Sequence, residues 1–116
     1  MVSLTNNDYV HNLWKKIVSE LYSKPAEIQT IRLNNSKGVW FLASSRYGII
    51  EINKSQVNKS SSKLKNTRKI NKKEFIELYP YYKPWKEGCS RKSMQGLSLN
   101  TSYILALISH FEKDNQ

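Results

Sequence analysis

The sequence predicts a small α+β domain in which a three-stranded antiparallel meander packs against an N-terminal and a C-terminal helix. Three observations support this fold class. Apolar residues recur at helical spacing near both ends of the chain, three short apolar segments alternate with tight turns in the first half, and 116 residues are enough for one core but rarely for two. We therefore expect residues 1–116 to form a single domain, with a basic loop and a short central helix before the last helix.

The first predicted element is an amphipathic helix over residues 6–23. Lys24 precedes Pro25 and is disfavoured in helical backbone, so we expect the helix to end there. The apolar residues that follow helical spacing on one face are Val10, Leu13, Trp14, Ile17, Val18 and Leu21.

Three short segments with strand character follow. Residues 28–33, 39–44 and 49–53 are rich in β-branched and aromatic residues, and short turns containing Gly38 and Gly48 separate them. Such short connections favour antiparallel neighbours. Because the middle segment, VWFLAS, is almost continuously apolar, we expect it to be covered on both faces.

The net charge of +10 is concentrated in the middle of the chain. Residues 54–92 hold twelve basic and three acidic residues, and no acidic residue occurs between Glu51 and Glu74. Within this stretch, residues 54–69 lack periodicity and are rich in Ser, Asn and Lys, which predicts a mobile basic loop. The charge block repels itself unless a polyanion neutralises it, so it favours a nucleic-acid contact surface; a merely solvated loop is the alternative.

The best local signal in the chain marks the start of the central helix. Asn71 and Glu74 are spaced for a capping box, and Ile70 and Phe75 are spaced for a hydrophobic staple. We expect a helix over residues 72–79, ended by the proline that follows.

Residues 79–92 interleave aromatic rings, prolines and cations, and we expect them to be extended or rich in turns. Aromatic faces stack on bases and cations hold phosphates, so this segment extends the predicted contact surface. The alternative is that Tyr79 and Trp85 fill the core. A last helix begins near Asn100 and is expected to pack on the first helix over one face of the sheet.

These observations favour a non-enzymatic nucleic-acid-binding protein, with duplex DNA favoured over RNA. The basic loop and the start of the central helix would contact phosphates, while Arg46 in a turn between strands, together with Arg68, would reach base edges or grooves. The predicted nucleic-acid-binding residues are Arg46, Lys54, Lys59, Lys63, Lys65, Arg68, Lys69, Lys72, Lys73, Tyr82, Trp85, Lys86, Arg91 and Lys92.

Two other classes of function stay open from the sequence. A metal-independent ribonuclease of the toxin kind would need Arg46, Tyr47, His110 and a central lysine to converge in a concave site. A basic module that binds an acidic protein is the other alternative. We assign no catalytic residue, because neither alternative has a motif that names one.

Other kinds of site are disfavoured by the same sequence. The only cysteine, Cys89, permits no intramolecular disulfide, and neither histidine has a second ligand at metal spacing, so we expect no metal and no cofactor. No segment approaches the roughly 18 apolar residues of a membrane span, and no signal-peptide pattern is visible. We therefore expect a cytoplasmic protein without a membrane partner, and its Asn-, Lys- and Ile-rich composition is typical of an AT-rich bacterium or its phage.

Overall fold

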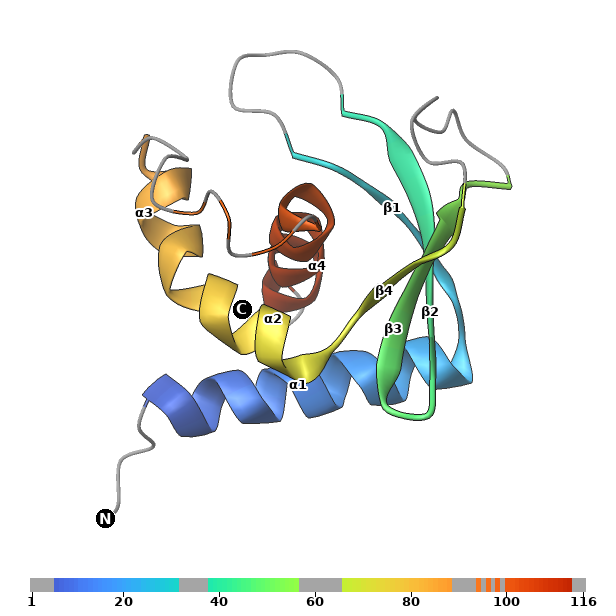
Figure 1. The fold of residues 1–116 in the computed structure, drawn as a ribbon, viewed down its shortest axis with the longest axis horizontal. Helices are drawn as coiled ribbons and strands as arrows, with labels where there is room; N and C mark the ends of the chain where they lie inside the picture. The colour runs from blue at the N-terminus through green and yellow to red at the C-terminus, as the bar shows by residue number, and fades with distance from the viewer. Residues whose placement is uncertain are drawn as a thin grey trace.

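The computed structural model describes residues 6–31, 38–56, 66–88 and 100–113, together with Met94, Gly96 and Ser98. The α+β class is confirmed, but the sheet has four strands instead of three (Figure 1). In chain order the elements are α1 (Asn6–Ser23), β1 (Ala26–Gln29), β2 (Trp40–Arg46), β3 (Ile49–Lys54), β4 (Arg68–Ile70), α2 (Lys72–Leu78), the 3-10 turn η1 (Tyr79–Tyr81), α3 (Tyr82–Lys86) and α4 (Thr101–Lys113).

The sheet has the strand order β1-β2-β3-β4, and each neighbouring pair is antiparallel. The strand that sequence periodicity does not reveal is β4, whose Ile70 pairs with Ile50. The predicted loop over residues 54–69 is therefore too long at both ends, because Lys54 ends β3 and Arg68 begins β4. A strand of three residues is too short to show the alternation of apolar and polar residues that predicts a strand. β4 forms by pairing with β3, and its Ile70 is buried in the core.

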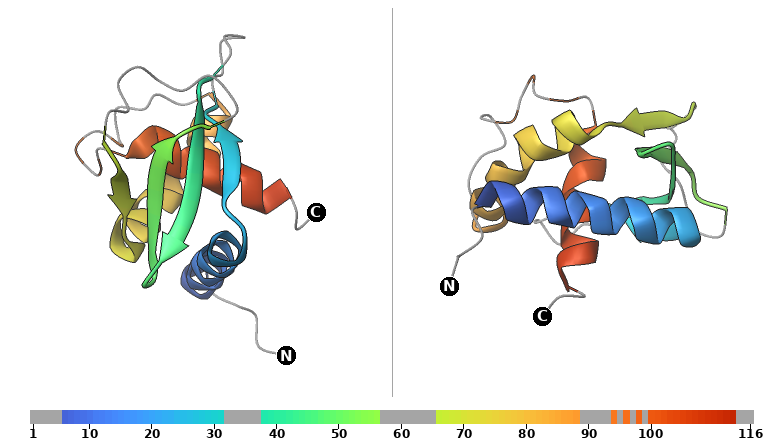
Figure 2. Two further views of the ribbon diagram at one scale, coloured as in Figure 1. Left: turned by 90° about the vertical axis from the view of Figure 1, so that its right-hand side faces the viewer. Right: turned by 90° about the horizontal axis from the view of Figure 1, so that it is seen from below.

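Among the described elements, the helices cover one face of the sheet (Figures 1 and 2). α1 packs on β2 and β3, and α4 packs on β1. Buried and half-buried residues alternate along β2, so only one of its faces is fully covered. The expectation that residues 39–44 are covered on both faces is wrong, because Trp40 and Leu42 on the outer face are only half buried.

β1 begins and ends earlier than the strand predicted over residues 28–33. Just beyond its end, Thr30 donates its backbone N–H to the Val39 carbonyl at 2.9 Å, and its Oγ1 accepts the Val39 N–H at 3.0 Å. Gly38 approaches so closely that a Cβ on it would stand 1.8 Å from the Thr30 carbonyl oxygen. Only glycine permits this contact between the two chain segments.

One hydrophobic core lies between the sheet and the helices. The ring centres of Trp14 in α1 and Phe75 in α2 are 5.3 Å apart. Those of Phe41 in β2 and Tyr103 in α4 are 5.0 Å apart, in an edge-to-face arrangement. α4 is the most enclosed helix, since every residue from Tyr103 to Ser109 is buried. The predicted packing of the two terminal helices over one face of the sheet is confirmed.

α2 begins at the predicted residue and has the predicted cap. The Glu74 N–H donates to the Asn71 side-chain oxygen at 2.8 Å, and the Glu74 carboxylate accepts the Asn71 N–H at 3.0 Å. Ile70 and Phe75, the two residues of the predicted staple, are both fully buried. Local capping and core packing therefore select the same helix start.

The helical path does not end at Pro80, which lies at the start of η1. Proline is tolerated in the first turn of a helix because its missing N–H would have no partner there. α3 then continues to Lys86 (Figure 1). The prediction that residues 79–92 are extended or rich in turns is thus wrong for α3, and residues 89–93 lie outside the described residues.

Candidate nucleic-acid interface

The structure distributes the predicted nucleic-acid-binding residues over several elements. Arg46 ends β2, Lys54 ends β3, and the remaining described members lie on β4, α2 and α3. The predicted residues outside the described part of the chain are Lys59, Lys63, Lys65, Arg91 and Lys92, and Cys89 also falls there.

Cations follow one another along β4 and into the start of α2. Lys69 and Lys73 are exposed, whereas Lys72 is half buried. Arg68 differs from them, because its register partner is the buried Ile52 and its guanidinium lies over the Tyr103 ring at 5.7 Å. Arg68 therefore lies over the margin of the core, whereas Lys69 and Lys73 are open to solvent.

The backbone at the start of α2 is already engaged within the protein. The capping box uses the N–H groups of Asn71 and Glu74. The other carboxylate oxygen of Glu74 accepts the Ser98 hydroxyl at 3.1 Å and the Asn100 amide at 3.4 Å. A phosphate approaching this end would therefore contact the ammonium groups of the neighbouring lysines more readily than these two amides.

Arg46 lies at the tip of the β2–β3 hairpin, where it pairs with Ile49 across a two-residue turn. The two turn residues, Tyr47 and Gly48, have φ values of 56° and 73°. Positive φ at both positions is typical of a type I′ turn, in which Asn-Gly is the favoured pair. Tyrosine is uncommon in this backbone conformation.

The side chains of the tip are open to solvent. Tyr47 is 91% exposed, and the Arg46 side chain is 65% exposed. The Arg46 guanidinium lies 5.8 Å from the centre of the Tyr47 ring, within the range of a cation–π contact. The tip thus presents a cation and an aromatic face together.

Glu51 connects the tip to β4. It lies directly opposite Lys69 in the β3–β4 register, and its Oε2 is 3.8 Å from Arg46 Nη2. Directly opposed residues point to the same face of a sheet, so these three side chains share the outer face. β4 also runs toward the end of the sheet that carries the β2–β3 turn (Figure 1). We call Arg46, Lys69, Lys72 and Lys73 the cationic border.

The hairpin is fixed to α1 by a hydrogen bond near its tip. Ser45 Oγ donates to the Val18 carbonyl of α1 at 2.6 Å. Figures 1 and 2 show the β2–β3 turn beside the C-terminal half of α1. Tyr22, one helical turn after Val18, is 72% exposed. Neither Tyr22 nor Tyr47 is among the residues predicted to bind nucleic acid, although Tyr-Gly in a two-residue hairpin turn is a usable signal for Tyr47.

The aromatic residues of α3 are less accessible than those of the tip. Trp85 is only 6% exposed and belongs to the core. Tyr82 is half buried, with its ring 6.3 Å from that of Trp85, whereas Lys86 is exposed. The Trp85 ring therefore contributes to packing, and the exposed side chains of α3 include those of Lys83 and Lys86.

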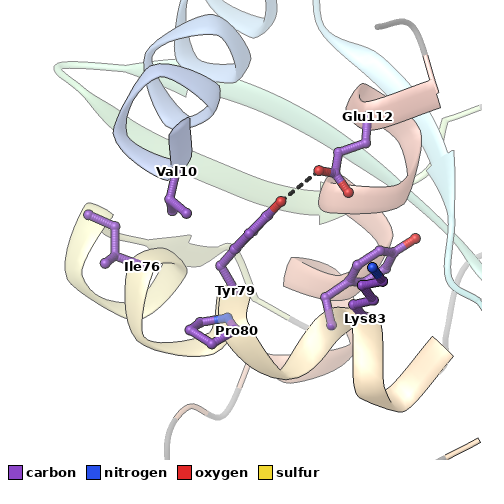
Figure 3. Close-up of a pocket in the computed structure, with 7 residues that line it drawn as sticks. Val10, Ile76, Tyr79, Pro80, Lys83 and Glu112 are labelled. Carbon is purple, nitrogen blue, oxygen red and sulfur yellow. Dashed lines mark hydrogen bonds between the residues drawn. The ribbon is translucent and has the colours of Figure 1, made fainter. Parts of the chain in front are cut away.

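A pocket of about 650 Å³ lies where the helices meet (Figure 3). Glu112 of α4 accepts hydrogen bonds from the hydroxyls of Tyr79 and Tyr9 on one carboxylate oxygen, each at 2.7 Å. Burial is the main cause that raises the pKa of both tyrosines, and the hydrogen bond to Glu112 raises it further. Both hydroxyls therefore remain neutral donors. The three residues thereby join α1, η1 and α4. The residues that line the pocket are Val10, Ile76, Tyr79, Pro80, Tyr82, Lys83 and Glu112.

His110 lines a separate hollow of about 380 Å³ together with Glu20 and Lys24. Arg46 and Tyr47 are not among the residues that line it. Within the described residues, the histidine and the arginine named for a ribonuclease therefore do not share a pocket. No three His, Cys, Asp or Glu side chains of this part of the chain are grouped so that they could hold a metal ion.

None of the helices in the described ranges is long and apolar enough to cross a membrane. No protein-family model matches this chain, and neither a curated protein nor a solved structure matches it. Function must therefore be inferred from the chemistry of the surfaces described above.

Proposed function

We propose that this protein binds nucleic acid without catalysing a reaction, and that duplex DNA is its preferred ligand. The observation that carries this proposal is the cationic border, in which Arg46 and Lys69 flank Glu51 on the outer face of the sheet and Lys72 and Lys73 follow in the first turn of α2. In the border Arg46, Lys69 and Lys73 are exposed, and Lys72 is half buried. Phosphate oxygens are the ligands that such an arrangement of ammonium and guanidinium groups favours.

The dimensions of the sheet suit a nucleic-acid backbone. Lys54 and Ile49 lie at opposite ends of β3, which places them about 17 Å apart at the usual strand rise. Successive phosphates of one DNA strand advance about 3.4 Å along the helix axis, so this length covers several of them. Lys59, Lys63 and Lys65 follow Lys54 in the sequence and contribute to the net positive charge of the chain.

The hairpin tip favours DNA over duplex RNA. The major groove of B-DNA is wide enough for a two-stranded ribbon, and an exposed arginine at its tip can reach guanine or a phosphate there. The major groove of A-form RNA is deep and narrow and excludes side chains mounted on such a ribbon. Arg46, exposed and next to Tyr47, is placed for the first kind of contact.

The test is a binding series with duplex DNA, single-stranded DNA, RNA and duplex RNA at several salt concentrations. Each phosphate neutralised on duplex DNA contributes about −0.9 to the slope of log K against log salt concentration, so engagement of four to six cations predicts a slope of about −4 to −5. We expect the tightest binding to duplex DNA. A slope near zero, or no binding at low salt, would contradict the proposal.

The same series separates the alternative functions. A module for an acidic protein would bind all nucleic acids weakly and without preference, whereas a ribonuclease would shorten RNA during the incubation. The ribonuclease has less support, because the hollow that contains His110 has one cation, Lys24, among its described lining residues. We therefore retain nucleic-acid binding as the proposed function.

A further inference from the structure

Tyr47 occupies a backbone position that does not favour tyrosine. Its φ of 56° lies in the left-handed region, where Asn, Asp and Gly are the favoured residues of a type I′ turn. Its ring is 91% exposed and therefore buries almost no surface within the protein. Neither the turn geometry nor the core explains an aromatic residue at this position.

The surroundings of Tyr47 hold the turn firmly while leaving the ring free. Arg46 and Ile49 close the turn as a strand pair, and the hydrogen bond from Ser45 Oγ to the Val18 carbonyl fixes the end of β2 to α1. The ring thus projects from a rigid support. The Arg46 guanidinium lies 5.8 Å from the centre of this ring. A ligand that contacts the ring would therefore have a cation next to it.

We propose that Tyr47 stacks on an unstacked base, and that the preferred ligand is duplex DNA with a locally open step, such as a bulged nucleotide. This inference rests on the proposed function and specifies its substrate. Aromatic rings stack on any base, and side chains wedged between base pairs unstack them at a cost that is smallest where pairing is already lost. Arg46 would hold a phosphate beside the stacked base.

The first measurement compares two DNA duplexes that differ by one bulged nucleotide at the centre. Stacking of one base on an aromatic side chain should favour the bulged duplex by about tenfold for the unaltered protein. Both duplexes carry the same backbone contacts for the cationic border, so their salt slopes should be similar. Equal affinity for the two duplexes would overturn the inference and leave the proposed function intact.

The deciding variant is Tyr47→Asn, which supplies the residue that the turn favours. We expect the melting temperature to stay unchanged or rise by roughly 3 °C. The preference for the bulged duplex should disappear, while affinity for the paired duplex should change less than about twofold, since no phosphate contact is removed. A residue with a merely structural role would instead lower the melting temperature when replaced.

Two control variants complete the test. Tyr47→Phe keeps the ring and should keep the preference, whereas Tyr22→Ala removes another exposed ring, on α1, and should also keep it. Retention of the preference in Tyr47→Asn, or its loss in Tyr22→Ala alone, would overturn the assignment to Tyr47. If the unaltered protein binds neither duplex at low salt, the proposed function fails together with this inference.

Discussion

The start of α2 and the tip of the β2–β3 hairpin both place a carboxylate among cations, but they use it differently. At the start of α2, Glu74 is half buried and accepts hydrogen bonds from Asn71, Ser98 and Asn100. At the tip, Glu51 forms an ion pair of 3.8 Å with an arginine whose side chain is 65% exposed. The first region satisfies its polar groups within the protein, and the second leaves its charged groups within reach of a ligand.

This difference means that stability and binding depend on neighbouring but separate groups. Replacing a group at the start of α2 that is hydrogen-bonded within the protein should destabilise the fold, because its partners lose their hydrogen bonds. Replacing an exposed group of the cationic border should change binding and leave stability nearly unaltered.

The largest effect is expected for Phe75→Ala. Phe75 is fully buried and contacts the Trp14 ring of α1 at 5.3 Å, so its removal leaves a cavity between α1 and α2. We expect the free energy of unfolding to fall by about 3–5 kcal/mol, measured by chemical denaturation. Ile76→Ala is the matched control in the same helix, and it should cost less because Ile76 is only half buried. An equal loss in both variants would contradict the assigned packing.

Asn100→Ala should have the next largest effect. The Asn100 side-chain amide, in a residue only 7% exposed, donates to the Lys69 carbonyl at 3.2 Å and to Glu74 at 3.4 Å. Removing it leaves two acceptors without this donor, which should cost about 1–3 kcal/mol. The folded Asn100→Ala protein should still bind DNA, because no residue of the cationic border is changed. Loss of binding in folded protein would show that the two regions are coupled.

Asn71→Ala removes one half of the capping box. The Glu74 N–H loses its acceptor at 2.8 Å, and we expect a loss of about 1 kcal/mol in thermal or chemical unfolding. Asn71→Ser is the control, since a serine hydroxyl can accept the same hydrogen bond and should restore most of the stability. A negligible effect of the alanine would mean that packing alone defines the helix start.

The capping box could be predicted because its signal is local. Asn71 and Glu74 are three residues apart, and the same short segment contains Ile70 and Phe75, so one stretch of sequence holds both the cap and the staple. The two long helices were predictable for a similar reason, because their apolar residues repeat over several turns. Features that depend on short-range spacing can be inferred without knowing the rest of the fold.

Features that depend on distant partners could not be inferred. β4 is three residues long and becomes a strand by pairing with β3. The Tyr9–Glu112 hydrogen bond joins residues 103 positions apart, and the Tyr79–Glu112 bond joins residues 33 positions apart. The burial of Trp85 likewise depends on what packs around α3. The charge block gives only the expectation of a polyanionic ligand, whereas the strand register places Arg46 and Lys69 on either side of Glu51.

The smallest effect on stability, and a large one on binding, is expected for Lys72→Glu combined with Lys73→Glu. These residues occupy the first turn of α2, where the helix dipole favours acids over cations, so the free protein should gain a few tenths of a kcal/mol. Binding to duplex DNA should weaken by more than tenfold, and the magnitude of the salt slope should fall by about 2 as two phosphate contacts are lost. Thermal unfolding and anisotropy titrations measure the two quantities.

Lys83→Glu combined with Lys86→Glu is the matched control for this change. Both lysines are exposed on α3, which lies away from the sheet in Figure 1, and the double substitution alters the net charge by the same amount. If long-range charge alone governed affinity, the two double variants would weaken binding equally. Because the border lysines continue the surface formed by Arg46 and Lys69, we expect the α2 variant to lose far more affinity. The opposite order would move the binding surface from the border to α3.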